Sequence, residues 1–378
     1  MMIYLDHAAT TPVRPGVWEA MAPYASEVFG NSSGIHGVSR RAKNALEEAR
    51  EGVAAAIGAD PMEIVFTSGG TESDNLAVKG PVFNGSDRNS VVVGAGEHDA
   101  VLEAADFIRR VGCSSTVVPL DHEGRVLREQ LVGALDSRTA VVSVMHTNNE
   151  TGSVEDIASI SAMVRAADPS ILIHTDAVQA VGSENLDVGE LGVDLMSITG
   201  HKFGGPKGTG LLYVRQGTSL EALLHGGGQE LGRRSGTHDV AGAVGLAFAM
   251  ESAIGDREQF QAQVGSVRDD FEKRLAAGIP DLVVNTPAEG RSSHHLNVRI
   301  PGVRNETLLM RLDQLGISAS AGSACQSGAA TVSHVLEAMG LSPAQARESV
   351  RFSFGWPSTL DEAAQAASVV IELVEDLR

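Results

Sequence analysis

The chain has 378 residues, of which 43% are hydrophobic and 20% are charged. This composition is typical of a soluble globular protein long enough for two domains, and it excludes a disordered or fibrous chain. The formal net charge of -19 argues against non-specific binding to a nucleic-acid backbone, because like charges repel.

The sequence carries no sign of a membrane or export segment. Its longest apolar run, at residues 240–250, is interrupted by glycine and is too short to span a bilayer. Residues 1–12 lack the charged and then apolar pattern of a signal peptide. We therefore expect a cytoplasmic protein. Its two cysteines, Cys113 and Cys325, cannot form a disulfide scaffold, so each is expected to be a free thiol.

Residues 4–12 predict an extended arm that ends at a proline, and residues 40–57 predict an amphipathic helix, since apolar residues recur there every three or four positions. Short Val/Ile-rich strand candidates follow at 64–67, 90–93, 116–120, 140–145, 171–175, 195–198 and 211–214. Helical stretches lie between several of them, at 73–78, 100–111, 128–135 and 154–167. This alternation predicts a mostly parallel, seven-stranded sheet covered on both faces, with ligands bound at the carboxyl ends of the strands.

From residue 241 the pattern changes. A long helical run to 275 is followed by strands at 282–284, 296–300 and 350–354 and by helices at 306–315, 332–339 and 360–377. We interpret this part as a smaller α+β domain. The expected division is a large domain at 14–255 and a small domain formed by 1–13 together with 256–378.

Lys202 lies in the most informative stretch, Ser-Ile-Thr-Gly-His-Lys-Phe-Gly-Gly-Pro-Lys-Gly at 197–208, which follows an apolar run and is too rich in Gly and Pro to be helical. A lysine amine whose pKa is lowered by desolvation or by a neighbouring cation can form a Schiff base with a carbonyl cofactor. His201 and Lys207 are candidate neighbours. The alternative is an ordinary solvated lysine in a turn.

Two other predicted strand ends offer partners for such a cofactor. Gly70 and Thr71 follow a strand and begin a helix, so their N–H groups and the hydroxyl can hold a phosphate, although a plain helix cap is the alternative. Asp176 follows a buried strand and needs a partner such as a protonated pyridine nitrogen, or else it caps a helix. Gln179 can reach the same ligand.

His98, at a further strand end, can stack on an aromatic ring or move a proton, or it is a surface histidine. Asn148 and Asn149 follow the strand at 140–145, where an amide can bind a ring oxygen or a carboxylate, or form a turn. A lysine, an aspartate, a phosphate cradle and a stacking histidine are together what pyridoxal 5'-phosphate requires.

These motifs, from Tyr-Leu-Asp-His-Ala-Ala-Thr-Thr-Pro at 4–12 to Arg-Phe-Ser-Phe-Gly at 351–355, resemble those of the NifS/IscS-type cysteine desulfurases, within the class V aminotransferase superfamily. The resemblance covers essentially the whole chain. It implies a fold-type I transferase that depends on pyridoxal phosphate and converts L-cysteine to L-alanine. In this reading the sulfur moves to an enzyme cysteine as a persulfide and then to an acceptor.

The resemblance also implies roles for the residues around the cofactor ring. Lys202 forms the Schiff base, Asp176 pairs with the pyridine nitrogen and Gln179 contacts the ring hydroxyl. His98 stacks on the ring and assists proton transfer. Asn148 lies near the ring and the substrate.

For the phosphate and the substrate, the resemblance implies that Gly70, Thr71, Thr199 and His201 hold the phosphate group. The Arg-Ser-Gly-Thr motif at 234–237 matches one that completes this site from the second subunit, so Thr237 and a homodimer are implied. Arg351 matches the arginine that binds the substrate carboxylate, a task suited to a bidentate guanidinium.

Cys325 lies in Ser-Ala-Gly-Ser-Ala-Cys-Gln-Ser-Gly-Ala-Ala at 320–330, where small residues suit a loop with an exposed thiol, and nearby cations would favour the thiolate. The loop at about 320–332 is expected in the small domain. The resemblance implies that Cys325 is the nucleophile, and the spacing to Ser333 is similar to the longer-loop, NifS/IscS-like group. We expect Cys113 to be structural. Thr199 departs from the family pattern, since serine is common there.

Several readings stay open at this point. The acceptor of the sulfur is an iron-sulfur scaffold protein or a tRNA-thiolation enzyme, and we expect neither direct contact with nucleic acid nor a metal site. A related class V enzyme, such as an aminotransferase or a selenocysteine lyase, is the alternative activity. A cofactor-free scaffold for sulfur-transfer partners is the alternative without catalysis.

Overall fold

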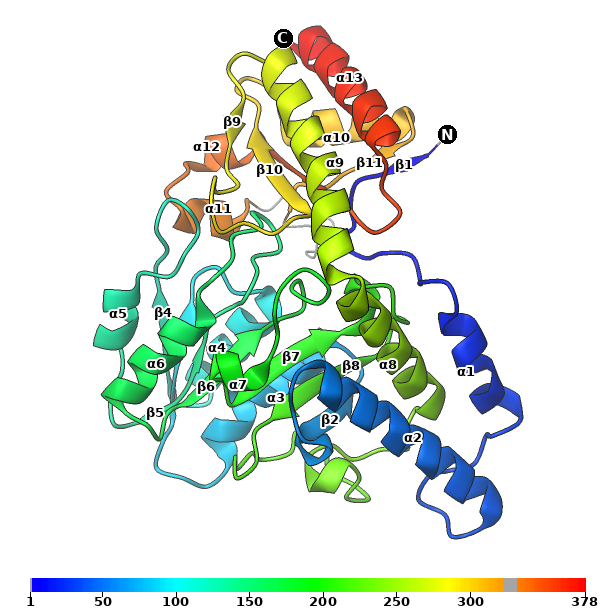
Figure 1. The fold of residues 1–378 in the computed structure, drawn as a ribbon. Coiled ribbons are helices and arrows are strands. Elements are labelled where there is room, and N and C mark those ends of the chain that lie inside the picture. Colours follow the sequence, from blue (N-terminus) through cyan, green and yellow to red (C-terminus); the bar gives the residue numbers. More distant parts are fainter. Residues whose placement is uncertain (1, 323–331) are drawn as a thin grey trace.

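The computed structural model describes residues 2–322 and 332–378 (Figure 1). Its main feature is a seven-stranded sheet with the strand order β2-β8-β7-β6-β5-β3-β4. The strands are β2 Ile64–Thr67, β3 Ser90–Gly94, β4 Ser114–Val118, β5 Thr139–Ser143, β6 Leu172–Asp176, β7 Leu195–Thr199 and β8 Gly210–Val214. Only β8 runs antiparallel to its neighbours, so the prediction of a mostly parallel sheet is confirmed.

Both faces of this sheet are buried. Alternate residues of each strand point to opposite sides, so each strand contributes to the core on both faces. In β3, Val91 and Val93 pack into the core under α3 and α4, whereas Val92 packs into the core on the other face. The helices of the large part are α1 Val17–Ser26, α2 Gly37–Ala56, α3 Gly70–Phe83, α4 Asp99–Arg110, α5 Arg128–Gly133, α6 Ile157–Ala167, α7 Val188–Leu191 and α8 Val240–Gly255. Short 3-10 turns lie at η1 Pro61–Glu63, η2 Gly200–Lys202 and η3 Glu230–Gly232.

The long helical run expected from residue 241 is two helices. α8 ends at Gly255, and α9 Arg257–Gly278 rises from there into the upper part of the molecule (Figure 1). The break lies at Asp256, whose carboxylate pairs with Arg14 at 2.9 Å. The division of the chain at 255/256 stays a prediction, and the helix break lies at that position.

The upper part has its own sheet and core. Its elements are β9 Val283–Val284, β10 His295–Arg299, β12 Ser349–Ser353, α10 Asn305–Gln314, α11 His334–Ala338, α12 Pro343–Ala346 and α13 Leu360–Leu377. The three strands form an antiparallel sheet. Phe271 of α9 packs against Phe352 and Phe354, with ring centroids 4.9 Å and 5.5 Å away, so α9 is fixed on this sheet by aromatic contacts.

The N-terminal arm joins the two parts. β1 Ile3–Tyr4 pairs in parallel with β11 Ile317–Ser318 of the upper part. A few residues later, the N–H of Thr11 donates to the carbonyl of His201, in the loop after β7. The arm therefore lies along the junction where both parts meet.

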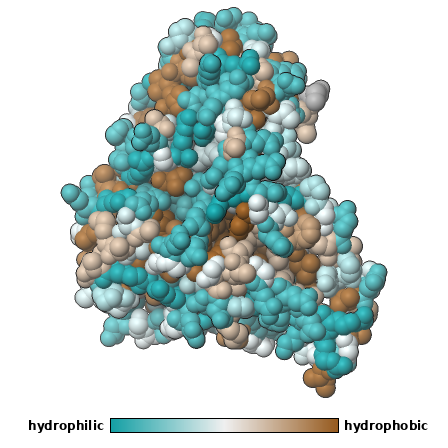
Figure 2. All heavy atoms as spheres, viewed as in Figure 1, coloured by the Kyte–Doolittle hydropathy of each residue, from teal (hydrophilic) through white to brown (hydrophobic). Residues whose placement is uncertain are grey.

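The face in Figure 2 is mostly hydrophilic, with scattered hydrophobic patches. No helix in the described part of the chain is long and apolar enough to cross a bilayer. The same residues contain no group of three or more His, Cys, Asp or Glu side chains placed to hold a metal ion.

Candidate active site

A cavity of about 320 Å³ lies between the carboxyl ends of the sheet strands, the N-terminal arm and β12. Strands that are distant in the sequence end at this edge, so their following loops converge there. The sequence-predicted residues that line it are Gly70, Thr71, His98, Asp176, Gln179, Thr199, His201, Lys202 and Arg351.

Lys202 ends the turn η2, directly after β7. Its Nζ donates hydrogen bonds to the carbonyl oxygens of Ala8 at 2.6 Å and Ala9 at 2.9 Å. The turn is tight because glycines allow two parts of its backbone to approach closely. A Cβ at Gly205 would lie 3.0 Å from the backbone of Gly200. The turn and the arm together fix the lysine amine at the cavity.

Asp176 is the last residue of β6 and is only 2% exposed. Its Oδ1 accepts a hydrogen bond of 2.8 Å from the N–H of Val178, and burial raises its pKa. The charged form would be favoured by a cation placed in the cavity. Gln179, just beyond, donates from Nε2 to the carbonyl of Ala8 at 2.8 Å.

A layer of buried acids beneath Asp176 was missed by the sequence analysis. Asp74 of α3 lines the cavity, and burial together with the charge of Asp176 raises its pKa well above the usual range. The pKa of Glu97 is raised by the same two causes, and Ser143 donates to its Oε1 at 3.1 Å. Because burial also lowers the pKa of His174 to about 3, the surroundings of Asp176 favour neutral groups. An acidic residue three or four positions after a glycine-rich helix start was the available signal for Asp74.

A glycine turn precedes α3 and borders the cavity. Gly69 has a φ of 148°, a value that favours glycine, and a Cβ on Gly70 would lie 2.9 Å from Val178. Thr71 lies in the first turn of this helix, whose N-terminus favours an anion.

Near the glycine turn before α3, Thr199 donates from Oγ1 to the carbonyl of Thr209 at 3.1 Å. The ring Nδ1 of His201 lies 3.2 Å from Thr10 Oγ1. Burial, with the charges of Lys202 and Lys207, lowers the pKa of His201 to about 4, so its ring is neutral at pH 7.

His98 and Arg351 lie in the same wall. His98 caps α4, where its Nδ1 accepts a hydrogen bond from the N–H of Ala100. Arg351 of β12 is 2% exposed and donates to the carbonyl of Asn149 at 2.8 Å and to Asp6 Oδ1 at 2.7 Å. The guanidinium therefore lies at the cavity with both Nη atoms held by these bonds, while its Nε has no hydrogen-bond partner among the described residues.

The asparagine that lines the cavity is Asn149, and Asn148 does not line it. The amide of Asn148 is buried and already used: its Nδ2 donates to the carbonyl of Gly96, and its Oδ1 accepts from Glu150 and Thr151. Asn148 thus shapes the turn, and its expected place near the ring and the substrate stays a prediction.

Two further predicted residues, Thr237 and Cys325, are considered separately. Thr237 is exposed and does not line the cavity of its own chain. Cys325 lies outside the described residues. Gly322, the last described residue before that gap, lines the cavity. Cys113 packs at the edge of the core under α3 and α4.

The model of the class-V aminotransferases matches residues 3–365. The chain belongs to this family. A curated relative from Dictyoglomus turgidum (strain DSM 6724 / Z-1310), named cysteine desulfurase IscS, is 43% identical over 377 residues, which is 100% of this chain and 95% of the relative. An IscS-like cysteine desulfurase from Mycobacterium tuberculosis (strain ATCC 25618 / H37Rv) is 43% identical, covering 98% of this chain and 95% of its own.

Similar solved structures have the same fold. A NifS-like protein superposes with a TM-score of 0.93 at 34% identity, with both chains fully covered. A structure described as SspA in complex with cysteine has a TM-score of 0.83 at 36% identity and covers 94% of this chain and 99% of its own. The fold and the resemblance to the IscS/NifS-type desulfurases predicted from the sequence are confirmed.

Proposed function

We propose that this chain is a pyridoxal-phosphate-dependent cysteine desulfurase, which converts L-cysteine to L-alanine and passes the sulfur to an acceptor. The observation that carries the proposal is the meeting of Lys202, Asp176 and Arg351 around one cavity in a class-V chain. Relatives named cysteine desulfurase, 43% identical over nearly their whole length, favour this activity over an aminotransferase or a selenocysteine lyase.

The residues present fit pyridoxal phosphate. The buried carboxylate of Asp176 matches a protonated ring nitrogen, and the helix N-terminus at Gly70 and Thr71 matches a phosphate, because it favours an anion. Thr71, Thr199 and His201 would complete the phosphate site, with Lys202 as the Schiff-base residue. When bound, the cofactor supplies an electron sink for the bond that breaks at Cα.

The chain's own residues would bind and orient the substrate. Arg351 binds the carboxylate of L-cysteine through a bidentate contact, and Asn149 lies beside it. The amine of Lys202 removes the Cα proton. Its contacts with Ala8 and Ala9 limit the positions from which it can do so.

Sulfur transfer is assigned to Cys325 on its sequence context and family match. Its thiolate forms a bond to the substrate sulfur while the bond between that sulfur and Cβ breaks, and the electron pair of the broken bond stays with the carbon fragment. Protons returned by Lys202, with help from His98, complete L-alanine. The persulfide on Cys325 then passes its outer sulfur to an acceptor thiol.

The assembly and partners are part of the proposal. We propose a homodimer in which Thr237 reaches the phosphate site of the other subunit, and its exposure in a single chain is compatible with that role. An iron-sulfur scaffold protein or a tRNA-thiolation enzyme takes the sulfur in the cytoplasm.

The first test is the production of sulfide and alanine from L-cysteine in the presence of a thiol reductant. Wild type and Cys113→Ala, the matched control, should give equal amounts of both products. Lys202→Ala and Cys325→Ala should give neither. If cofactor-loaded wild type formed a keto acid and no alanine, the chain would be an aminotransferase and not a desulfurase.

A further inference from the structure

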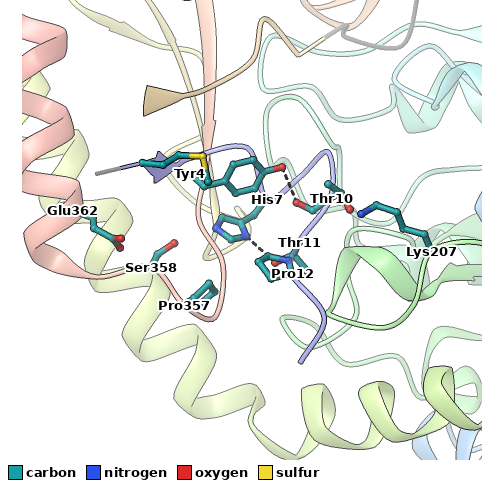
Figure 3. A pocket seen from close by; sticks show the side chains of 10 residues that line it. Tyr4, His7, Thr10, Thr11, Pro12, Lys207, Pro357, Ser358 and Glu362 are labelled. Atoms are coloured by element: carbon teal, nitrogen blue, oxygen red, sulfur yellow. Dashed lines mark hydrogen bonds between the residues drawn. The ribbon is translucent and has the colours of Figure 1, made fainter. Parts of the chain in front are cut away.

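Three hollows follow one another along the N-terminal arm. An outer groove of about 380 Å³, shown in Figure 3, is open at the surface, and His7 and Thr11 are part of its wall. An inner cavity of about 20 Å³ is also lined by these two residues. The inner cavity in turn shares Gln179 and Lys202 with the active-site cavity. The three hollows therefore adjoin one another, through shared wall residues, from the surface to Lys202.

The wall between the outer groove and the inner cavity is polar. His7 Nδ1 and Thr11 Oγ1 are 2.7 Å apart, as the dashed line in Figure 3 marks. The ring of Tyr4 packs edge-on against His7, with the centroids 4.9 Å apart. Burial lowers the pKa of His7 to about 4, so the ring is neutral at pH 7 and can accept a proton from the hydroxyl.

The inner cavity contains two buried polar atoms in need of a partner. Among residues 2–322 and 332–378, neither Trp356 Nε1 nor His294 Nδ1 has a hydrogen-bond partner, and both side chains line this cavity. Such atoms are rare in folded proteins unless ordered water binds them. Burial lowers the pKa of His294 to about 3, so its Nδ1 can act as an acceptor while the indole N–H donates. A volume of 20 Å³ has room for about one water molecule.

We propose that the inner cavity binds a water molecule to Trp356 and His294, and that this water, with Thr11 and His7, forms a proton route between Lys202 and the outer groove. The route rests on the proposed function, in which Lys202 removes a proton, whereas the water site does not. Arg14, which also lines the inner cavity, is paired with Asp256.

The transfer is balanced at every atom. The ammonium of Lys202 gives one proton to the water, and the water gives one of its own to the hydroxyl of Thr11. Thr11 passes its hydrogen to His7 Nδ1, and His7 releases one proton to solvent in the outer groove. Water and Thr11 end neutral, no electron moves, and the reverse sequence delivers a proton to Lys202.

The water site is tested by NMR on the cofactor-loaded protein. The chain has two tryptophans, and Trp18 is 60% exposed, so Trp18→Phe leaves Trp356 as the sole indole. We expect its N–H proton to show dipolar contact with a long-lived water. An indole N–H of Trp356 with no such contact would overturn the water site. Trp356→Phe, which keeps Trp18, gives the signal of an indole in bulk solvent for comparison.

The route is tested with L-cysteine that carries deuterium at Cα, by measuring the deuterium retained at Cα of the alanine formed. Wild type should retain little, because the lysine proton exchanges with solvent. Thr11→Val keeps the shape but lacks the hydroxyl, and retention should rise severalfold. Tyr4→Phe, which alters the outer groove only, is the matched control and should behave as wild type.

The outcomes separate the two ideas. Equal retention in Thr11→Val and wild type would overturn the route, since the lysine would then exchange by another path. Wild type that forms no alanine would overturn the proposed function, and the indole measurement would still decide the water site.

Discussion

Glu230 is the acid whose replacement by glutamine should cost the most stability outside the active site. Its carboxylate receives bonds of 2.8 Å and 2.9 Å from Arg50 and one of 3.0 Å from the N–H of Phe66. His238 Nε2 lies 3.0 Å away, and the side chain of Glu230 is 1% exposed. Glu230 thus ties the loop that carries Thr237 to α2 and β2.

The magnitude follows from the pKa of this group. Burial alone would raise the pKa of Glu230, but bonds from His238 and Arg50 outweigh it and lower the pKa from 4.5 to about 2. That difference corresponds to roughly 3 kcal/mol of native-state stability, in line with the ~3–5 kcal/mol lost when one partner of a buried ion pair is removed. Glu230→Gln should therefore lower the free energy of unfolding by roughly 3 kcal/mol.

The assay is urea unfolding of wild type, Glu230→Gln and the matched control Glu47→Gln. Glu47 bonds the same arginine, at 3.1 Å, but its side chain is 46% exposed, so the control should lose under about 1 kcal/mol. Because the pKa of Glu230 is depressed, its contribution is full above pH 4.5 and is lost as pH falls towards 2. Equal losses of unfolding free energy in the two variants would refute the reasoning. So would a difference in stability between wild type and Glu230→Gln that stays the same in acid.

Three further changes test other parts of the structure. Asp176→Asn should weaken cofactor binding by about 100-fold or more, since a buried charge pair loses one partner, and titration of the apo-protein by cofactor absorbance measures it; an unchanged dissociation constant would contradict the pairing. Arg351→Lys should raise the KM for L-cysteine roughly 10–100-fold, because a bidentate contact becomes a single charge, with kcat less affected in steady-state assays. Gly355→Ala should destabilise the fold by about 1–3 kcal/mol, since its Cβ would overlap His7. Chemical unfolding measures this loss against Gly255→Ala, where a Cβ meets nothing within 4 Å and φ is not positive, and equal losses would contradict the clash.

Segments with a strong local pattern could be predicted almost to the residue. β2 at Ile64–Thr67 and α13 at Leu360–Leu377 have the predicted bounds. In both segments the pattern of buried residues is local, and the cap at Thr359 also fixes the start of α13. The chemistry of strand ends was equally readable, since Lys202, Asp176 and Gly70 each follow a buried strand and parallel strands end at one edge.

What failed depends on contacts between distant residues. The strand pair β1 and β11 has two residues on each side, too few for any periodicity. The long helical run was predicted as one helix, and the pairing of Asp256 with Arg14 at its break joins residues far apart in the sequence. Asn148 and Asn149 are chemically identical neighbours, and only the carbonyl of Gly96 and the turn at Thr151 determine which one reaches the cavity.

The pairing of the N-terminal arm with the C-terminal part also restricts when the site can form during synthesis. Ile3 pairs with Ile317, and Asp6 receives its bond from Arg351, so these two contacts of the arm cannot form until most of the chain has left the ribosome. The seven-stranded sheet can fold earlier, as its strands end at Val214. A nascent chain that stops after Val214 but before Ile317 would hold a folded sheet and a site that still lacks Arg351. Binding of the cofactor should therefore be one of the last steps of its biogenesis.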